Sequence, residues 1–188
     1  MAGWIITGII IILALWGVAL YNALVALRQR NRQAFADIDV QLKQRHDLVP
    51  NLVETVKGYA KHERDTLDAV INARNTAVSA RGPVQKAEAE GVLSAALGRL
   101  VALAEAYPDL KANQNFLELQ RQLDDIENKI AAARRFFNSA AAEYNAKRES
   151  VPAAFIANFF GFAPEAFFDL GEEKRAELEV PPPVSFQQ

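Results

Sequence analysis

The chain of 188 residues contains 21 Lys and Arg against 23 Asp and Glu, which gives a formal net charge of −2 at pH 7. This balance excludes the broad basic surface that binds a nucleic-acid backbone, so we expect no nucleic-acid partner. The absence of cysteine excludes disulfides, thiol chemistry and thiolate metal sites. An alanine-rich composition favours helices over strands and predicts an all-α protein.

Residues 4–27 form an apolar run without a charged side chain. As a helix the run would be about 36 Å long, enough to cross a hydrocarbon core of about 30 Å. A cleaved signal peptide is the alternative, but it requires a basic start, a shorter apolar core and a small-residue cleavage site, and the run has none of these. We therefore predict a transmembrane anchor in residues 1–27, with membrane lipid as its partner.

Three arginines, Arg28, Arg30 and Arg32, follow the apolar run at once, and no Lys or Arg precedes it. Basic residues beside a membrane segment are retained in the cytoplasm. This asymmetry predicts an N-terminus outside and the bulk of the chain in the cytoplasm.

The soluble part, residues 28–150, is predicted as an antiparallel bundle of long, coiled-coil-like helices. Apolar residues at steps of three and four predict a first helix over residues 28–80, which Pro50 should bend or break. A second helix covers residues 84–107. The third, from Phe116 to the residues before Ser150, carries a regular heptad pattern.

The lengths of these helices predict a homo-oligomer. A first helix of about 80 Å and a second of about 36 Å leave the membrane-proximal part of the first without a partner from its own chain. That part nevertheless carries an apolar stripe, which should not remain in water. We predict that its residues pack between subunits, and a fold-back at Pro50 is the alternative. The stripe consists of Phe35, Ile38, Leu42 and Val49.

Residues 151–188 differ in composition and form a third region, rich in phenylalanine and ending in a proline-containing tail. The phenylalanine cluster either docks on the end of its own bundle or offers an apolar surface to a partner or a membrane. The candidate contact residues of the second alternative are Phe159, Phe160, Phe162, Phe167 and Phe168.

No pattern of catalytic, cofactor-binding or metal-binding residues occurs. His46 and His62 are too far apart on one helix to share a metal, and neither belongs to an H-E-x-x-H or E-x-x-H pattern. Nucleophile-elbow, phosphate-loop and dinucleotide-binding motifs are absent as well. We expect no cofactor and no enzyme activity.

Several long blocks of the sequence resemble the LemA family: DIDVQLKQRHDLVPNLV over residues 37–53, YPDLKANQNFLELQ over 107–120, AARRFFNSAAAEYN over 132–145 and the final PxVxF over 182–186. The resemblance implies a bacterial single-pass protein of the inner membrane, with a short outer N-terminus and a cytoplasmic helical bundle. It supplies no catalytic residue.

These observations predict a non-enzymatic membrane-anchored scaffold or adaptor that self-associates and binds an unidentified protein. The alternative is a regulatory or sensor subunit of a membrane protease, a transporter or an envelope-stress system. An enzyme with an unrecognised site is a third possibility.

Overall fold

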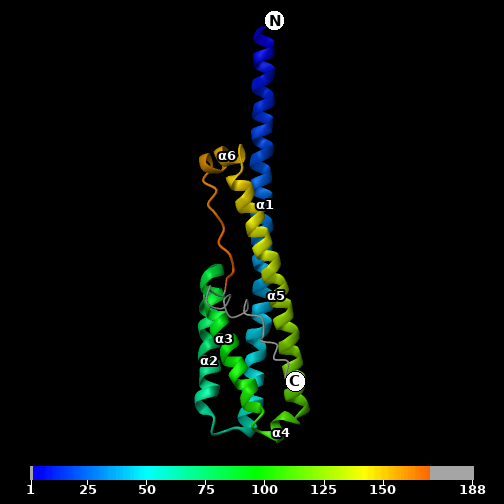
Figure 1. Cartoon of the computed structure of the whole chain (residues 1–188), viewed down its shortest axis with the longest axis vertical. Helices are drawn as coiled ribbons and strands as arrows, with labels where there is room; N and C mark the ends of the chain where they lie inside the picture. The colour runs from blue at the N-terminus through cyan, green and yellow to red at the C-terminus, as the bar shows by residue number, and fades with distance from the viewer. Residues whose placement is uncertain (1, 170–188) are drawn as a thin grey trace, which may run out of the picture. The chain divides into compact units, whose positions relative to one another are not determined.

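The computed structural model describes residues 2–169, and every regular element within them is a helix (Figure 1). The predicted all-α class, with one long apolar N-terminal helix followed by a helical bundle, is confirmed. The proline-containing tail predicted for the end of the chain lies outside the described residues. The helices are α1 (Ala2–Tyr59), α2 (Arg64–Ser79), α3 (Gly82–Ala104), α4 (Pro108–Lys111), α5 (Gln114–Glu149) and α6 (Ala153–Phe159).

The described chain divides into two compact units. The first contains residues 2–44 and 125–167, which are the N-terminal part of α1, most of α5, and α6. The second contains residues 45–124 with 168–169, which include the end of α1, helices α2 to α4 and the start of α5.

In the first unit α1 and α5 run antiparallel. Phe35 of α1 packs on Phe137 of α5 with ring centroids 5.5 Å apart. Five residues earlier on α1, Arg30 pairs with Glu143, six residues later on α5, at 2.8 Å. α5 therefore runs back toward the N-terminal part of α1, and the chain then turns into α6.

The second unit is built from two consecutive helical hairpins. A short turn at residues 60–63 joins α1 to α2, and Arg74 of α2 donates from Nε to the carbonyl of His46, 2.8 Å away, so the two helices are antiparallel. The turn from α2 to α3 ends at Gly82, whose φ of 67° lies in the left-handed region that favours glycine. Pro83 follows in the first turn of α3, where a missing donor costs nothing.

The structure corrects the first predicted helix in two ways. α1 is continuous from the apolar run through Pro50 to Tyr59, so Pro50 does not break it. Pro50 is exposed while the neighbouring Val49 and Leu52 are buried, so packing on the opposite face holds the helix together. α1 ends at Tyr59, the chain turns at residues 60–63, and α2 then runs back along α1. The prediction of a single helix that runs to residue 80 is therefore wrong.

The same correction removes the reason given for a homo-oligomer. Ile38, Leu42 and Val49 are 0%, 2% and 1% exposed in a single chain, and Phe35 is half-buried. The prediction that no part of the chain covers this stripe is therefore wrong. It treated residues 28–80 as one rod, and so missed both the early hairpin and the return of α5 along α1. The stripe does not require a second subunit.

Candidate functional site

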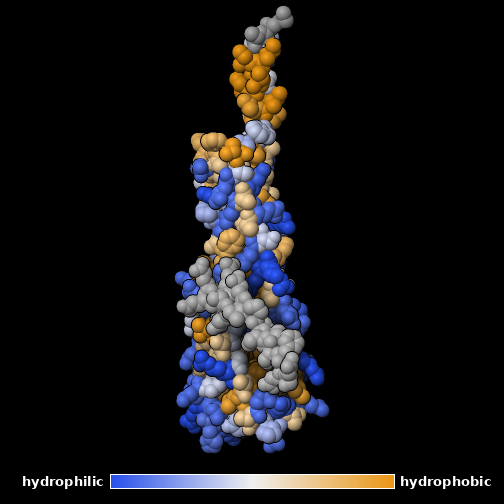
Figure 2. Space-filling view, in the orientation of Figure 1, coloured by the Kyte–Doolittle hydropathy of each residue, from blue (hydrophilic) through white to orange (hydrophobic). Residues whose placement is uncertain are grey.

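The N-terminal part of α1 presents apolar side chains on all sides. The large apolar side chains of residues 4–18 are more than half exposed, from Trp4 at 85% to Trp16 at 52%. Figure 2 shows this segment as a continuous apolar surface on the visible face. A helix that is apolar all round belongs in an apolar surrounding, and α1 is the one described helix long and apolar enough to cross a membrane.

Burial begins where the C-terminal end of the first unit reaches α1. Tyr21 packs edge-on against Phe160 and Phe162, with ring centroids 4.9 Å and 5.5 Å apart. One turn further, Leu24 is fully buried in a cluster with Tyr144, Ala157 and Phe162. Residues 4–18 thus face outward, whereas the last part of the apolar run is covered by the protein itself.

An apolar groove of about 340 Å³ lies between α1 and α6. Gly17 faces Ile156 across this groove, and a Cβ added at Gly17 would meet Ile156 Cδ1 at 4.0 Å, an ordinary van der Waals contact. The groove is lined by Ala14, Gly17, Val18, Tyr21, Ile156 and Phe160. All but the Tyr21 hydroxyl is apolar, so the groove can hold a hydrocarbon chain and offers no catalytic group.

The segment after α6 is tied down to α5 by hydrogen bonds to its backbone. Arg148 Nε donates to the carbonyl of Phe162 at 2.7 Å, and the Tyr144 hydroxyl donates to the carbonyl of Ala163 at 2.8 Å. Asn145 donates to the Glu165 carbonyl at 2.9 Å and accepts from its amide at 3.0 Å. Burial raises the pKa of Tyr144, so the hydroxyl remains a donor at neutral pH.

These contacts separate the five candidate contact phenylalanines into two groups. Phe159, Phe160 and Phe167 are exposed, and Phe159 is 83% accessible. Phe162 and Phe168, at 4% and 1%, are buried within the chain and cannot form a contact surface. Phe162 is also covered by the Arg28 guanidinium, 4.9 Å from its ring centroid. Their inclusion in the contact set was wrong because phenylalanine content alone does not tell a docked ring from a free one.

Phe155 belongs to the same phenylalanine-rich stretch but was not among the candidate contact residues, and it is 71% exposed. Phe155 and Phe159 are four residues apart and share one face of α6, while Ala153 and Ala157 share the buried face. The signal was present in the spacing, since small and large apolar residues alternate on opposite sides of this short helix.

The second unit contains a buried polar cluster that the sequence did not reveal. Arg45 of α1 pairs with Glu90 of α3, and both side chains are less than 5% exposed. His46 Nε2 lies 2.7 Å from the second carboxylate oxygen of Glu90, and Arg45 also donates to the Ser94 hydroxyl at 2.9 Å. Both oxygens of Glu90 are therefore engaged, which links α1 to α3 in one register.

The electrostatics of this cluster keep His46 neutral. Burial lowers the pKa of His46 to about 4, and the charges of Arg45 and Arg74 act in the same direction. A neutral imidazole donates from Nε2 to Glu90. Because Glu90 is engaged on both oxygens and buried, it has no open position for a substrate or a metal.

The structure does not bring the two histidines into one site. His46 belongs to the buried cluster, whereas His62 is exposed in the turn after α1. No group of three or more His, Asp or Glu side chains that could hold a metal occurs among residues 2–169.

The comparisons with known proteins agree on one family. The model of the LemA family matches residues 34–186. The chain is 26% identical to magnetosome protein MamQ of Magnetospirillum gryphiswaldense over 89% of this chain and 71% of that protein, and 24% identical to MamQ 1 of Paramagnetospirillum magneticum over the same shares. It is 25% identical to protein LemA of Metamycoplasma hominis over 85% of this chain and 73% of that protein.

Proposed function

Because this chain belongs to the LemA family, we propose that it is a non-enzymatic, membrane-anchored helical scaffold or adaptor that self-associates. The observation that carries the proposal is the exposed apolar segment of α1, which anchors a bundle whose buried charges at Arg45 and Glu90 pair with each other. The names of the relatives, a magnetosome protein and a LemA protein, describe no enzyme activity.

The proposed location is the bacterial inner membrane, with the N-terminus outside and the bundle in the cytoplasm. Arg28, Arg30 and Arg32 support this orientation, because they lie just beyond the apolar segment at the start of the bundle. Arg30 lies over the ring of Phe136 and Arg28 over the ring of Phe162, both in the same unit. These contacts keep the two positive charges just beyond the apolar segment.

The proposed self-association uses the face of α1 that α6 leaves free. Gly17, Tyr21 and Leu24 share the side that contacts the C-terminal end of the first unit. Ala19 follows Gly17 by two residues, a rotation of about 200° on a helix, so it lies on the opposite side. Ala19 and Ala23 are small residues four apart, the spacing at which membrane helices approach closely.

Cross-linking in native membranes tests this interface, since the chain has no cysteine of its own. Single cysteines at Leu15 and Ala19, on the free face, should give disulfide-linked dimers on mild oxidation. Ile10→Cys, also exposed but on the opposite face, and Ile38→Cys, at a buried position, are the controls and should give none. Strictly monomeric protein with no cross-link at Leu15 or Ala19 would exclude self-association through α1.

The regulatory or sensor role predicts a different result. The same cysteines would then form cross-links to another polypeptide in a fixed ratio. Recovery of that heterologous product in place of the dimer would favour the regulatory subunit over the self-associating scaffold.

A further inference from the structure

We propose that α6 is a second membrane contact: its exposed phenylalanine face lies in the boundary between headgroups and acyl chains of the bilayer that α1 crosses. The occupant of this face is lipid. The inference rests on α1 spanning the membrane and is independent of self-association.

The position of α6 along α1 places it near the edge of the bilayer. The helix from Gly3 to Leu20 is about 27 Å long, close to the thickness of a hydrocarbon core. The exposed stretch of α1 ends at this point, and Tyr21 contacts Phe160 of the segment that begins with α6. Arg28 lies seven residues beyond Tyr21, about 10 Å along the helix, which is outside the hydrocarbon core because each headgroup layer is about 5–8 Å deep. α6 is therefore at the surface of the hydrocarbon core.

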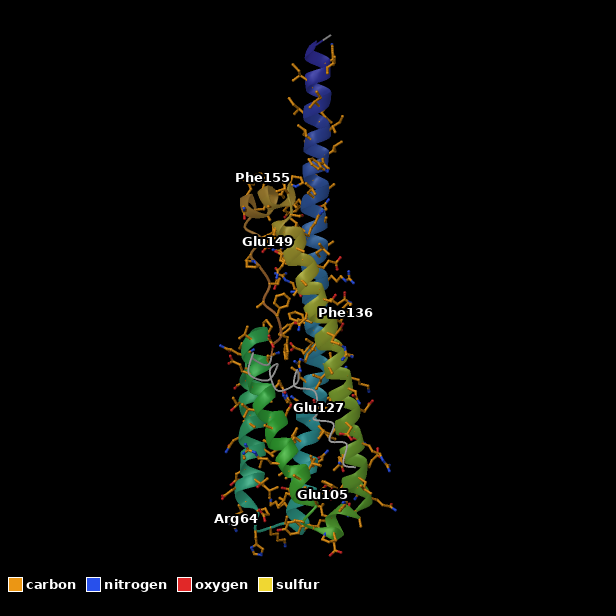
Figure 3. All side chains as sticks on the ribbon, in the orientation of Figure 1. Arg64, Glu105, Glu127, Phe136, Glu149 and Phe155 are labelled. Atoms are coloured by element: carbon orange, nitrogen blue, oxygen red, sulfur yellow. The ribbon has the colours of Figure 1, made fainter. Side chains whose placement is uncertain are left out.

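The two faces of α6 differ in burial. Ala153 and Ala157 are fully buried against the first unit, whereas Phe155 and Phe159 on the opposite face are 71% and 83% exposed. Within this unit, α6 lies beside α1 at the end of α5 (Figure 1), and Phe155 is closer than Glu149 to the exposed segment of α1 (Figure 3). The exposed apolar face is thus nearer to the bilayer than the charged end of α5.

Continuity of the apolar surface identifies lipid as the occupant. The groove between α1 and α6 joins the side chains of Val18 and Ala14, within the exposed segment of α1, to Ile156 and Phe160. A protein that covered α6 would have to displace lipid from α1 at the same level. Large aromatic side chains on a short helix beside a membrane segment are typical of interfacial anchors.

A depth measurement on the full-length protein tests the proposal. Single cysteines at Phe155 and Phe159 carry nitroxide labels, and the purified protein is placed in vesicles of phosphatidylcholine and phosphatidylglycerol. Accessibility to oxygen, which concentrates in lipid, is compared with accessibility to a water-soluble nickel complex. Both labels should be severalfold more accessible to oxygen than to the nickel complex.

Phe136 is the matched control, because it is an exposed phenylalanine of the same unit on α5, stacked near Arg30. A label there should have the opposite preference. A label at Ile10 reports the anchor itself and should be the deepest.

Three outcomes would overturn the proposal. Labels at 155 and 159 that behave like the label at 136, while the one at Ile10 is deep, would show that α6 faces water although the anchor stands. Protection of 155 and 159 only in native membranes would assign the face to a protein partner. A label at Ile10 that faces water would remove the anchor and the inference together.

Discussion

Two parts of the same helix meet different surroundings, and their side chains show how. Residues 4–18 of α1 are apolar on every side and exposed, whereas residues 34–56 bury one stripe and leave polar side chains outside. In the second part the stripe includes a charged residue, Arg45, which is buried only because Glu90 neutralises it. One helix therefore has two roles. Its first part is an anchor whose exposed apolar side chains suit a membrane, and its second part belongs to the core and packs against other helices of the chain.

The largest effect should come from the buried charge of the second part. Arg45→Ala leaves Glu90 buried without its guanidinium and should destabilise the protein by about 3–5 kcal/mol. Arg30→Ala removes an arginine from an ion pair that is about half exposed and should cost no more than about 1 kcal/mol. Denaturant unfolding of the full-length protein in nanodiscs, followed by circular dichroism, measures both.

A rescue variant sharpens this test. Replacing the pair together, as Arg45→Met with Glu90→Leu, removes both charges and should recover most of the lost stability. If the double variant is as unstable as Arg45→Ala, the network with His46 and Ser94 matters more than the ion pair.

The next effect separates the two parts by their surroundings. Ile11 and Val40 are almost equally exposed, at 54% and 53%. Ile11→Arg places a charge in the middle of the apolar segment and should disfavour membrane insertion by about 3 kcal/mol. Val40→Arg should leave insertion and folding unchanged, because its side chain meets water. Carbonate extraction of membranes measures insertion, and equal extraction of the two variants would contradict the assignment of residues 4–18 to lipid.

A pH dependence confined to the second part gives a further comparison. The pKa of His46 is about 4 in the folded protein and 6.5 without its surroundings, so the unfolded chain binds the proton more readily. This contribution to stability is complete above pH 6.5 and declines as the pH falls toward 4. The groups around His46 are Arg45 and Asp47 of α1, Arg74 of α2, and Lys86 and Glu90 of α3.

Thermal unfolding of the parent and of His46→Gln between pH 7.5 and 4 measures this dependence. The variant should lose less stability than the parent over that range, since the amide of a glutamine side chain does not bind a proton there. Parallel curves for the two proteins would show that His46 is not the group responsible.

Local pattern was enough to predict several features. The uncharged run that ends at Leu27 predicts the membrane segment, and the spacing of Phe116, Leu123 and Ile130 predicts α5 almost to its ends. Both signals lie in consecutive residues, where helix period and hydrophobicity are read directly.

Tertiary structure decided the features that depend on which segments meet. Arg45 reads as one more polar residue until α3 brings Glu90 to it, and Phe162 and Phe159 are alike in sequence until Tyr144 and Arg28 enclose one and leave the other free. α1 ends at Tyr59 and not at residue 80, and Ile38 is covered by its own chain; both depend on contacts between residues far apart in sequence. The sequence by itself determined which residues are apolar and at what period. Only the packing decided which of those surfaces the protein covers for itself and which are left for the membrane, because burial depends on non-local neighbours that periodicity does not specify.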